Sequence, residues 1–421
     1  MRVSLIETAR SPRRAQRMVS TRAAARDASV VPHEPAPITA IFSMESVTVI
    51  ITCQPLPILH RLALSIGIVG LPNVGKSTLF NALTNAGILA ANYPFTTIEP
   101  NTGIVPIPDP RVDRLAEMFG SSKRTNATVT FVDIAGLVEG ASKGEGLGNQ
   151  FLANIREVNA ICHVVRAFES ANVAHVEEKL DPARDIEVIE TELAIADLET
   201  IDRRLPKMEK EMTVDKSLQP VVNTLRKVRE VVAAGEMVSR HPDLMQLEPH
   251  FSDLHLLTAK PVIYVFNMDE TGLSDSQRRA ELADLASSAW ALFLDAQIES
   301  ELIELEPDDR LELLESIGQT EPGLDAVVRA AYDTLGLQSF LTANENEARA
   351  WTIRVGATAP EAAGVIHTDF QRGFIAAEVI SFDALMEAGS WAAARSAGLV
   401  RTEGKSYVMR PSDVVQFRFN V

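Results

Sequence analysis

The stretch Gly70-Leu-Pro-Asn-Val-Gly-Lys-Ser77 matches the pattern G-x-x-x-x-G-K-[ST]. It follows the β-rich run 64–69 and precedes the apolar run 78–83, which is the strand–loop–helix context that the motif requires. Glycines let the backbone approach phosphate oxygens, and the N–H groups at a helix start attract anions. The stretch therefore predicts a P-loop that binds a nucleoside triphosphate.

Two side chains of this loop carry the expected chemistry. Lys76 is predicted to contact the β- and γ-phosphates as a catalytic residue, and the Ser77 hydroxyl to bind Mg²⁺. The alternative is a chance match without function. The predicted nucleotide-binding residues of the loop are Gly70, Leu71, Pro72, Asn73, Val74, Gly75, Lys76, Ser77 and Thr78.

The run Asp133-Ile-Ala-Gly136 predicts the second half of the site. A carboxylate at a strand end suits a Mg²⁺-linked aspartate, and Gly136 can offer its N–H to the γ-phosphate. The alternative is an ordinary turn after a strand. Within 93–100, Thr97 or its neighbour Thr96 is expected to complete the Mg²⁺ shell. The glycine-rich run 140–148 predicts a second switch loop that orders when a γ-phosphate is present.

The group that positions the attacking water is less obvious from the sequence. Many P-loop hydrolases carry Gln directly after the Asp-x-x-Gly element, but this chain has Leu137. His175, in a polar stretch after a strand end, is one catalytic candidate, although a lone His is more often structural. The Asn73 side chain is another candidate, because its oxygen could hold K⁺ against the phosphates.

The strand 261–267 ends in Asn267-Met268-Asp269-Glu270, where guanine-selective proteins usually carry Asn-Lys-x-Asp. Moving the carboxylate one methylene outward, as Glu270 does, should weaken the bidentate pair with guanine. Asn267, Met268 and Glu270 are therefore predicted to contact a base. ATP is expected to be preferred, and GTP binding at reduced selectivity stays open, as does a turn that contacts no base.

Continuous apolar runs at 64–69, 129–133, 160–165 and 261–267 alternate with helical stretches. Such runs are typical of strands buried on both faces of a parallel sheet. The alternation predicts an α/β fold with a doubly wound, mainly parallel sheet.

A helical insertion interrupts this pattern. Two series of apolar residues at 3-4-3-4 spacing predict two helices packed as an antiparallel coiled-coil hairpin. The first series is Leu198, Ile201, Leu205, Met208 and Met212, and the second is Leu218, Val221, Leu225, Val228 and Val232. Residues 215–217 are the expected tip, and Pro220 suits the first turn of the second helix. Pro206 is expected to lie mid-seam and to kink or split the first helix.

The C-terminal part predicts a small α+β module with short strands at 351–355, 376–380, 406–409 and 414–419. At the other end, residues 1–61 are rich in Arg, Ala, Ser and Pro. They predict a disordered extension, for example from an upstream start codon, with a transit peptide as the alternative.

Composition narrows the classes of partner. The two cysteines exclude a disulfide framework and fit a cytoplasmic protein. The net charge of −17 argues against binding DNA or RNA over the whole surface, so an RNA contact would need a local patch. No run of 18 apolar residues occurs, so no membrane span is expected.

Together these motifs resemble the YchF / Obg-like ATPase family, from about residue 62 to the end. The resemblance rests on the P-loop, on Tyr93–Asn101, Asp133–Val138 and Gly144–Leu152, on Glu270 of the Asn-x-x-Glu motif, and on a C-terminal segment 351–421 that looks like a TGS module. It implies ATP/ADP and the ribosome as partners and a catalytic histidine at His175. A monomer is expected as well. Two departures are Pro206 and Asp295-Ala296-Gln297, where the family usually shows Ser-Ala-x.

The implied architecture is a P-loop domain with a coiled-coil insertion and a C-terminal β-grasp (TGS) domain. The predicted parts are 1–61 (extension), 62–196 and 257–335 (P-loop domain), 197–256 (insertion) and 336–421 (TGS). The leading hypothesis is a Mg²⁺-dependent ATPase that acts as a ribosome-associated switch. A GTPase of the Obg ribosome-assembly type and a binding scaffold with negligible turnover are the alternatives.

Overall fold

The computed structural model describes residues 38–44, 47–53, 64–90, 101–134, 147–168, 180–287 and 289–420. It divides into two units, Met1–His60 and Arg61–Val421. In the first, β1 (Ile38–Met44) and β2 (Val47–Cys53) pair antiparallel, with Ile38 opposite Cys53. This hairpin differs from the disorder expected for 1–61; the rest of that segment lies outside the described residues.

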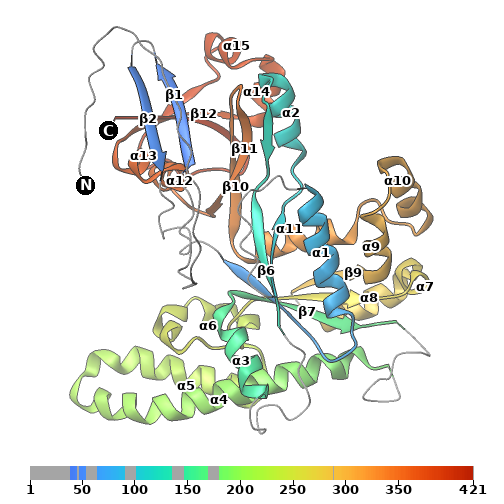
Figure 1. Cartoon of the computed structure of the whole chain (residues 1–421). Coiled ribbons are helices and arrows are strands. Elements are labelled where there is room, and N and C mark those ends of the chain that lie inside the picture. Colours follow the sequence, from blue (N-terminus) through green and yellow to red (C-terminus); the bar gives the residue numbers. More distant parts are fainter. Residues whose placement is uncertain are drawn as a thin grey trace, which may run out of the picture. The chain divides into compact units, whose positions relative to one another are not determined.

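A six-stranded sheet organises the first part of the larger unit (Figure 1). Its strands lie in the order β4-β6-β3-β7-β8-β9, and only the edge pair β4–β6 is antiparallel. Their bounds are β3 (Ser65–Val69), β4 (Thr102–Pro106), β6 (Thr128–Asp133), β7 (Ala160–Arg166), β8 (Val262–Asn267) and β9 (Trp290–Leu294). All seven residues of β7 are buried, as expected for a strand covered on both faces. The predicted mainly parallel α/β sheet is confirmed.

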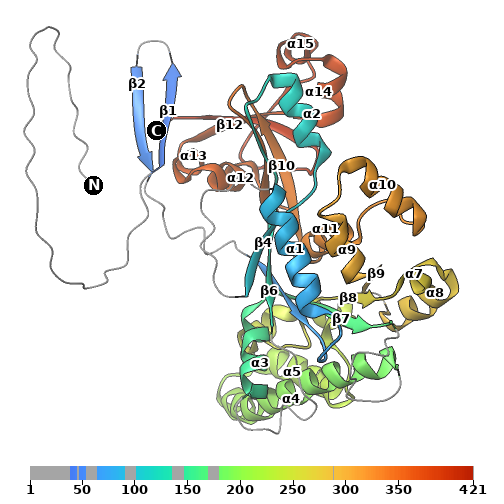
Figure 2. The same cartoon turned by 45° about the vertical axis from the view of Figure 1, so that its right-hand side comes forward.

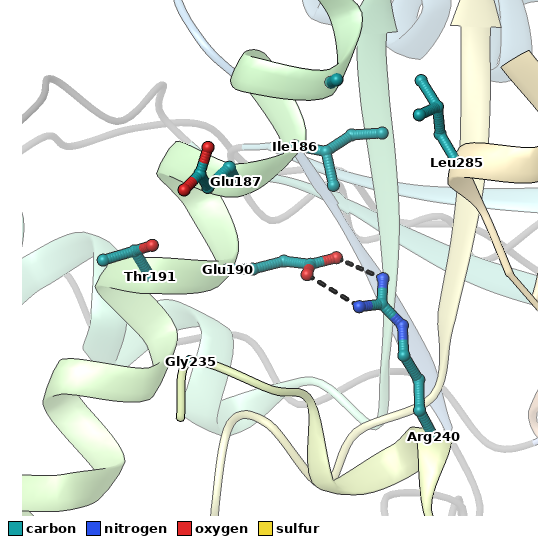
Figure 3. Close-up of a pocket in the computed structure, with 8 residues that line it drawn as sticks. Ile186, Glu187, Glu190, Thr191, Gly235, Arg240 and Leu285 are labelled. Carbon is teal, nitrogen blue, oxygen red and sulfur yellow. Dashed lines mark hydrogen bonds and ion pairs between the residues drawn. The ribbon is translucent and has the colours of Figure 1, made fainter. Parts of the chain in front are cut away.

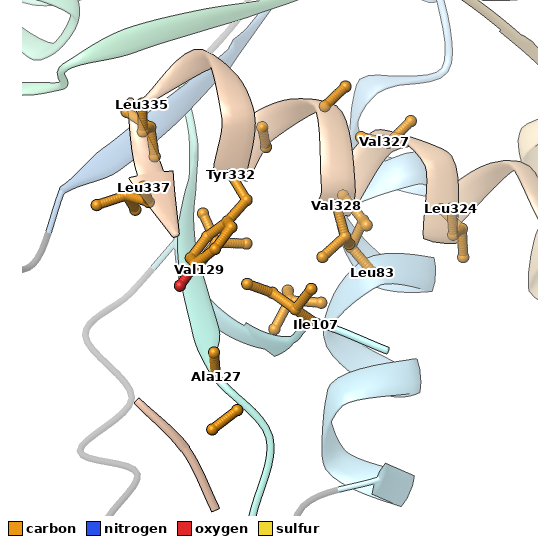
Figure 4. Packing of buried hydrophobic residues seen from close by; sticks show 14 of the residues in the cluster. Leu83, Ile107, Ala127, Val129, Leu324, Val327, Val328, Tyr332, Leu335 and Leu337 are labelled. Atoms are coloured by element: carbon orange, nitrogen blue, oxygen red, sulfur yellow. The ribbon is translucent and has the colours of Figure 1, made fainter. Parts of the chain in front are cut away.

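Helices cover both faces of this sheet. On one face, α1 (Lys76–Ala90) and α11 (Gly323–Thr334) contribute Leu83, Val328 and other apolar side chains to the large core shown in Figure 4. On the other face, α3 (Leu147–Glu157) and the start of α4 (Pro182–Val214) bury a second apolar cluster. The remaining helices of this part are α2 (Pro110–Phe119), α7 (Glu270–Ser274), α8 (Ser276–Leu285), α9 (Ala296–Leu302) and α10 (Pro307–Ser316).

The predicted helical hairpin consists of α4 and α5 (Gln219–Ala233), which run side by side in Figures 1 and 2. Their buried seam forms a separate apolar cluster. The short helix η2 (Lys216–Leu218) makes the tip, and Pro220 lies in the first turn of α5, as predicted. Four short elements lead back to the sheet: η3 (Val238–Arg240), α6 (Pro242–Met245), η4 (Glu248–His250) and η5 (Ser252–Leu254).

The expectation that Pro206 splits the first helix is wrong. Helix α4 continues through Pro206 as one element of 33 residues. Pro206 is exposed beside the buried Leu205, so it lies off the seam rather than within it. Because proline has no N–H, one helix hydrogen bond is missing there, but on the exposed face water can satisfy the freed carbonyl.

The C-terminal part forms a second six-stranded sheet in the order β13-β12-β14-β10-β11-β5. Its strands are β10 (Leu337–Ala343), β11 (Glu347–Arg354), β12 (Phe374–Ser381), β13 (Arg401–Glu403), β14 (Asp413–Phe419) and β5 (Lys123–Thr125). Its helices are α12 (Ala359–Ile366), α13 (Thr368–Arg372), α14 (Phe382–Ala388) and α15 (Trp391–Ser396). The module is consistent with the predicted TGS-type fold. The expected strand 406–409 is wrong, because only one bridge, Val408 to Thr358, forms there.

Strand β5 joins the two sheets within this unit. It belongs in sequence to the P-loop part, yet Lys123, Arg124 and Thr125 pair in parallel with Glu347, Ala348 and Arg349 of β11. The Thr125 hydroxyl also donates to the Glu347 carboxylate at 2.5 Å. The predicted domain boundaries stay predictions, and the one at 196/197 falls inside α4.

Candidate functional site

The P-loop connects β3 directly to α1, and its shape requires glycine at both ends. A Cβ on Gly70 would lie 2.4 Å from the Val164 carbonyl oxygen, and one on Gly75 would lie 2.3 Å from the Asn267 amide nitrogen. Gly75 has a φ of 99°, in the region that side chains other than glycine rarely adopt. Asn73 has a φ of 62° and is exposed at the tip of the loop.

The Asn267 side chain holds the P-loop in place by a hydrogen bond to its main chain. It lies at the end of β8 with 6 % of its surface exposed. Its Nδ2 donates to the Val74 carbonyl at 3.0 Å, and its Oδ1 accepts from the Ala296 N–H at 3.0 Å. One buried amide therefore ties the P-loop to the loop after β9, so that the carboxyl ends of the parallel strands form one site.

Lys76 begins α1 and is buried. Its Nζ donates to the Leu71 carbonyl at 2.8 Å, which folds the ammonium group over the P-loop. Burial lowers the pKa of Lys76 from its usual value, and the Asp133 carboxylate opposes that shift. The cation is thus held inside the loop, where phosphate oxygens could replace the carbonyl as its partner.

The Asp133 side chain fits a Mg²⁺ site by its chemistry. It ends β6, and its Oδ1 is buried without a hydrogen-bond partner. Burial raises the pKa of Asp133, while the charge of Lys76 acts in the opposite direction. The Ser77 hydroxyl, in the first turn of α1, offers a second oxygen of the kind Mg²⁺ prefers. The described residues contain no group of three or more His, Cys, Asp or Glu that could hold a metal, so phosphate oxygens and water would have to supply the other ligands.

A cavity of about 810 Å³ extends from the P-loop to the ends of β8 and β9. At the phosphate end it is lined by Asn73, Gly75, Lys76, Ser77 and Thr78, and at the far end by Phe168, Asn267, Met268, Asp269, Asp295, Ala296 and Gln297. A nucleoside triphosphate needs a long cavity of this kind, with donors and a cation at one end and a half-apolar slot at the other.

Comparisons with known proteins agree with this geometry. Residues 65–196 match the family model described as a 50S ribosome-binding GTPase, and residues 337–420 match the YchF-GTPase C-terminal model, described as a protein of unknown function (DUF933). A Haemophilus ducreyi protein named ribosome-binding ATPase YchF is 50 % identical over 359 residues, covering 84 % of this chain and 99 % of the relative.

The chain belongs to the YchF family. A Bacillus subtilis relative with the same name is 46 % identical over 366 residues, covering 86 % of this chain and all of the relative. A solved Schizosaccharomyces pombe YchF GTPase is 35 % identical with a TM-score of 0.75, covering 85 % of this chain and 98 % of that one. The resemblance read from the motifs is therefore confirmed, and so is the fold class.

Not every predicted contact of this YchF family member lies in the cavity. Met268 lines it, but only 1 % of the residue is exposed, and its side-chain Cε packs close to Gly272. Glu270 is exposed at the start of α7 and is not among the lining residues. Four predicted site residues and Leu137 lie outside the described residues, namely Thr96, Thr97, Gly136 and His175.

Five lining residues were not among the predicted contacts: Phe168, Asp269 and the run 295–297, which the sequence marked only as a departure from the family pattern. Phe168 follows β7, and the guanidinium carbon of Arg166 lies 4.8 Å from the centre of its ring. Asp269 caps α7 by accepting from the Gly272 N–H at 2.8 Å. The signal was present in the positions directly after buried strands, where side chains point into the site.

A second, smaller cavity of about 190 Å³ lies beside α4 (Figure 3). Its polar wall is an ion pair in which Arg240 donates to both oxygens of Glu190, at 2.9 and 2.6 Å. The Tyr264 hydroxyl also contacts Glu190. These groups satisfy one another, and the cavity shares no lining residue with the P-loop cavity, so we assign it a structural role.

Proposed function

We propose that this protein is a Mg²⁺-dependent ATPase that prefers ATP over GTP and acts as a nucleotide-dependent switch on the ribosome. The chain is a nucleotide-hydrolysing P-loop enzyme of the YchF family. The observation that supports the finer proposal is the phosphate cradle, in which the buried Lys76 cation lines one end of a large cavity. Lys76 interacts electrostatically with Asp133, whose Oδ1 has no hydrogen-bond partner.

In the proposed reaction, water attacks the γ-phosphorus in line with the bond to the β,γ-bridging oxygen. That bond breaks, and the products are ADP and inorganic phosphate. Lys76 exchanges its bond to Leu71 for phosphate oxygens and stabilises the charge on the transferred group. The N–H groups of the P-loop do the same without reorganising. Ser77, Thr97 and Asp133 would hold Mg²⁺, which supplies positive charge to the phosphate oxygens when bound.

His175 is the proposed group that orients the water, because Leu137 has no polar atom to do so. This role rests on the sequence and on the family resemblance, since both residues lie outside the described residues. Gly136 is proposed to donate its N–H to the γ-phosphate. Asn73 is proposed as the contact for K⁺, if a second cation is required, and its exposed position at the loop tip supports that assignment.

The preference for ATP rests on the relatives' names and on the loss of the guanine pattern. The Haemophilus ducreyi and Bacillus subtilis relatives are named ATPases. In this chain Met268 replaces the lysine of Asn-Lys-x-Asp and is buried in the wall of the cavity. Asn267, by contrast, keeps the position from which a side chain can support both the P-loop and a base.

Association with the ribosome is proposed because both relatives are named ribosome-binding. The joint between β5 and β11 supports a switch that reaches the C-terminal module. Strand β5 leads within three residues into β6, and β6 ends at Asp133. A cytoplasmic, monomeric protein with ATP and ADP as ligands remains our prediction. In the described part of the chain, no helix has the length and apolar character to cross a membrane.

A GTPase is the second candidate. The description of the family model and the name of the Schizosaccharomyces pombe protein both contain the word GTPase. Equilibrium titration with ATP, GTP, ADP and GDP in Mg²⁺ separates the two candidates, and Lys76→Ala serves as the site control. We expect tighter binding of ATP than of GTP, and at least tenfold weaker binding to the variant because a charge-assisted contact is lost. Single-turnover hydrolysis with and without ribosomes tests the scaffold alternative.

A further inference from the structure

The wall of the cavity formed by the ends of β8 and β9 is poor in free donors. The N–H of Met268 donates to the Leu294 carbonyl at 2.8 Å, and that of Ala296 to Asn267 Oδ1 at 3.0 Å. The N–H of Gln297 donates to Asp295 Oδ1 at 2.8 Å. These three main-chain donors are therefore not available to a base without breaking a bond of the protein. One N–H of the Asn267 side-chain amide donates to Val74, which leaves the second N–H of that group as a remaining donor.

The same wall carries an acceptor with spare capacity. Asp295 caps α9 with one oxygen only, because both the Gln297 and the Ile298 N–H groups donate to Oδ1, at 2.8 and 3.2 Å. Among the described residues, none donates a hydrogen bond to Oδ2. Asp295 is half-buried and lines the cavity. Burial raises the pKa of Asp295, and the nearby carboxylates of Asp269 and Glu301 raise it further.

We propose that Asp295 determines which purine this protein binds, by accepting a hydrogen bond from the exocyclic 6-amino group of adenine. The 6-amino group of adenine fits a wall with one free acceptor and committed main-chain donors, whereas guanine carries an oxygen at position 6 and its amine at position 2. Guanine could offer its N1–H, but its O6 lies directly beside that group. O6 would face a carboxylate and find its possible donor, the Ala296 N–H, bound to Asn267. An unsatisfied, desolvated carbonyl opposes binding.

This inference rests on the proposed function and deepens it. The sequence reasoning assigned base selection to Glu270, which is exposed and does not line the cavity. Asp295 instead occupies the position where the family usually shows serine. A serine would also cap α9, so the cap alone does not require a carboxylate. Compared with that serine, Asp295 adds a negatively charged carboxylate to the wall of the proposed base slot.

The test is competition binding of ATP, GTP and ITP to the full chain in Mg²⁺, with Asp295→Asn as the variant. Asparagine is nearly isosteric and a good helix cap, but its amide nitrogen turns the free acceptor into a donor. We expect the ratio of ATP to GTP affinity to fall by about tenfold or more. The affinity for ITP should rise together with that for GTP, because both bases carry a 6-oxo group. Asp295→Ser should lower ATP affinity without the gain for GTP and ITP.

The matched control is Asp275→Asn. Asp275 caps α8 in the same manner, accepting from the Arg278 N–H at 3.0 Å, but it does not line the cavity. Its nucleotide ratios should equal those of the wild type. An unchanged ATP to GTP ratio in Asp295→Asn, with binding intact, would overturn the role of Asp295 and leave the proposed ATPase in place. Failure of the wild type to bind any of the three nucleotides would instead remove the proposed function itself.

Discussion

Asn267 donates its side-chain amide to the main-chain carbonyl of Val74 at 3.0 Å, across 193 residues of sequence. Gly75, the neighbour of Val74, leaves the space that this amide occupies, because a Cβ there would lie 2.3 Å from Nδ2. The phosphate cradle is therefore a contact between two distant parts of the chain as well as a local motif.

Gly75→Ala should break this contact. Forcing alanine to a positive φ costs about 1–2 kcal/mol, and displacing the Asn267 amide costs about 1 kcal/mol more. We expect ATP affinity to fall at least tenfold in equilibrium titration. Gly318→Ala is the control, because Gly318 has a φ of 70° and open space around it. That variant should lose stability but keep its ATP affinity; equal losses of affinity in both would show that strain alone is responsible.

Asp133→Asn should weaken the binding of Mg²⁺ without weakening the Mg²⁺-independent binding of the nucleotide. Removing the carboxylate should raise the Mg²⁺ concentration for half-maximal ATP binding about tenfold or more, since a neutral amide is a poorer ligand. Binding measured in EDTA should change little. If the Mg²⁺ dependence is the same in both proteins, Asp133 does not contribute to the metal site.

The same variant should alter the stability of the nucleotide-free protein in a direction fixed by linkage. Burial raises the pKa of Asp133 in the folded state, so the ionised group disfavours folding at neutral pH. Asp133→Asn should therefore melt at a higher temperature than the wild type at pH 7–8. The difference should shrink as the pH falls through the raised pKa of folded Asp133, and it should be gone below roughly 4, where both states of the wild type bind the proton.

His175→Ala should slow hydrolysis while ATP binding stays as in the wild type. Loss of a group that orients or activates water typically costs about 10²- to 10⁴-fold in rate. Single-turnover assays with saturating ATP and Mg²⁺ measure the chemical step directly. Turnover equal to the wild type would mean that another group positions the water.

Glu299→Gln should remove a pH dependence of stability. The Glu299 carboxylate accepts from the Gly323 and Leu324 N–H groups, at 2.6 and 3.2 Å. Burial raises its pKa from 4.5 to about 7 despite those bonds, and Asp325 and Asp295 act in the same direction as burial. The folded protein thus holds a proton that the unfolded chain releases, so its stability falls as the pH rises through this window.

That loss amounts to about 3 kcal/mol between pH 4.5 and 7, and it is constant at higher pH. The melting temperature of the wild type relative to Glu299→Gln should fall across this window by several degrees. A constant offset between the two proteins from pH 5 to 8 would mean that Glu299 is ionised throughout. The hydrogen bond to Leu324 that the variant loses changes the difference in melting temperature by a constant amount. It does not change how that difference varies with pH.

Pro206→Ala should stabilise the hairpin. The substitution restores a helix N–H and replaces an exposed proline inside α4, where proline costs about 3 kcal/mol relative to alanine. We expect a gain of about 1–3 kcal/mol, seen as a higher melting temperature. Pro220→Ala is the matched control: Pro220 lies in the first turn of α5, where proline is tolerated, so no gain is expected. A gain in both variants would point to a general effect of proline removal.

The sequence by itself determined the parts of this protein whose physics is local. Buried strands have to be apolar throughout, a phosphate loop needs glycine at fixed positions, and a helical seam repeats every three or four residues. Those rules gave β3, β6, β7, β8, the P-loop and α5 with nearly correct bounds, whereas α4 begins about fifteen residues before the predicted seam. Short strands such as β13 have too few residues to show a period, and the run 406–409 has strand-like composition but meets only one partner residue.

Only the tertiary structure decided which distant groups share a surface. Pro206 lies on the exposed face because the seam of α4 turns away from it, a rotation too small for spacing alone to fix. Strand β5 pairs with the free edge of β11 and so extends the C-terminal sheet. The residue types at 123–125 do not predict this pairing. Asp295 lines the cavity and Glu270 does not, because β8 and β9 pair in parallel and end side by side. Hydrogen-bond partners far apart in the chain, and which donors remain free, are consequences of packing that no local pattern contains.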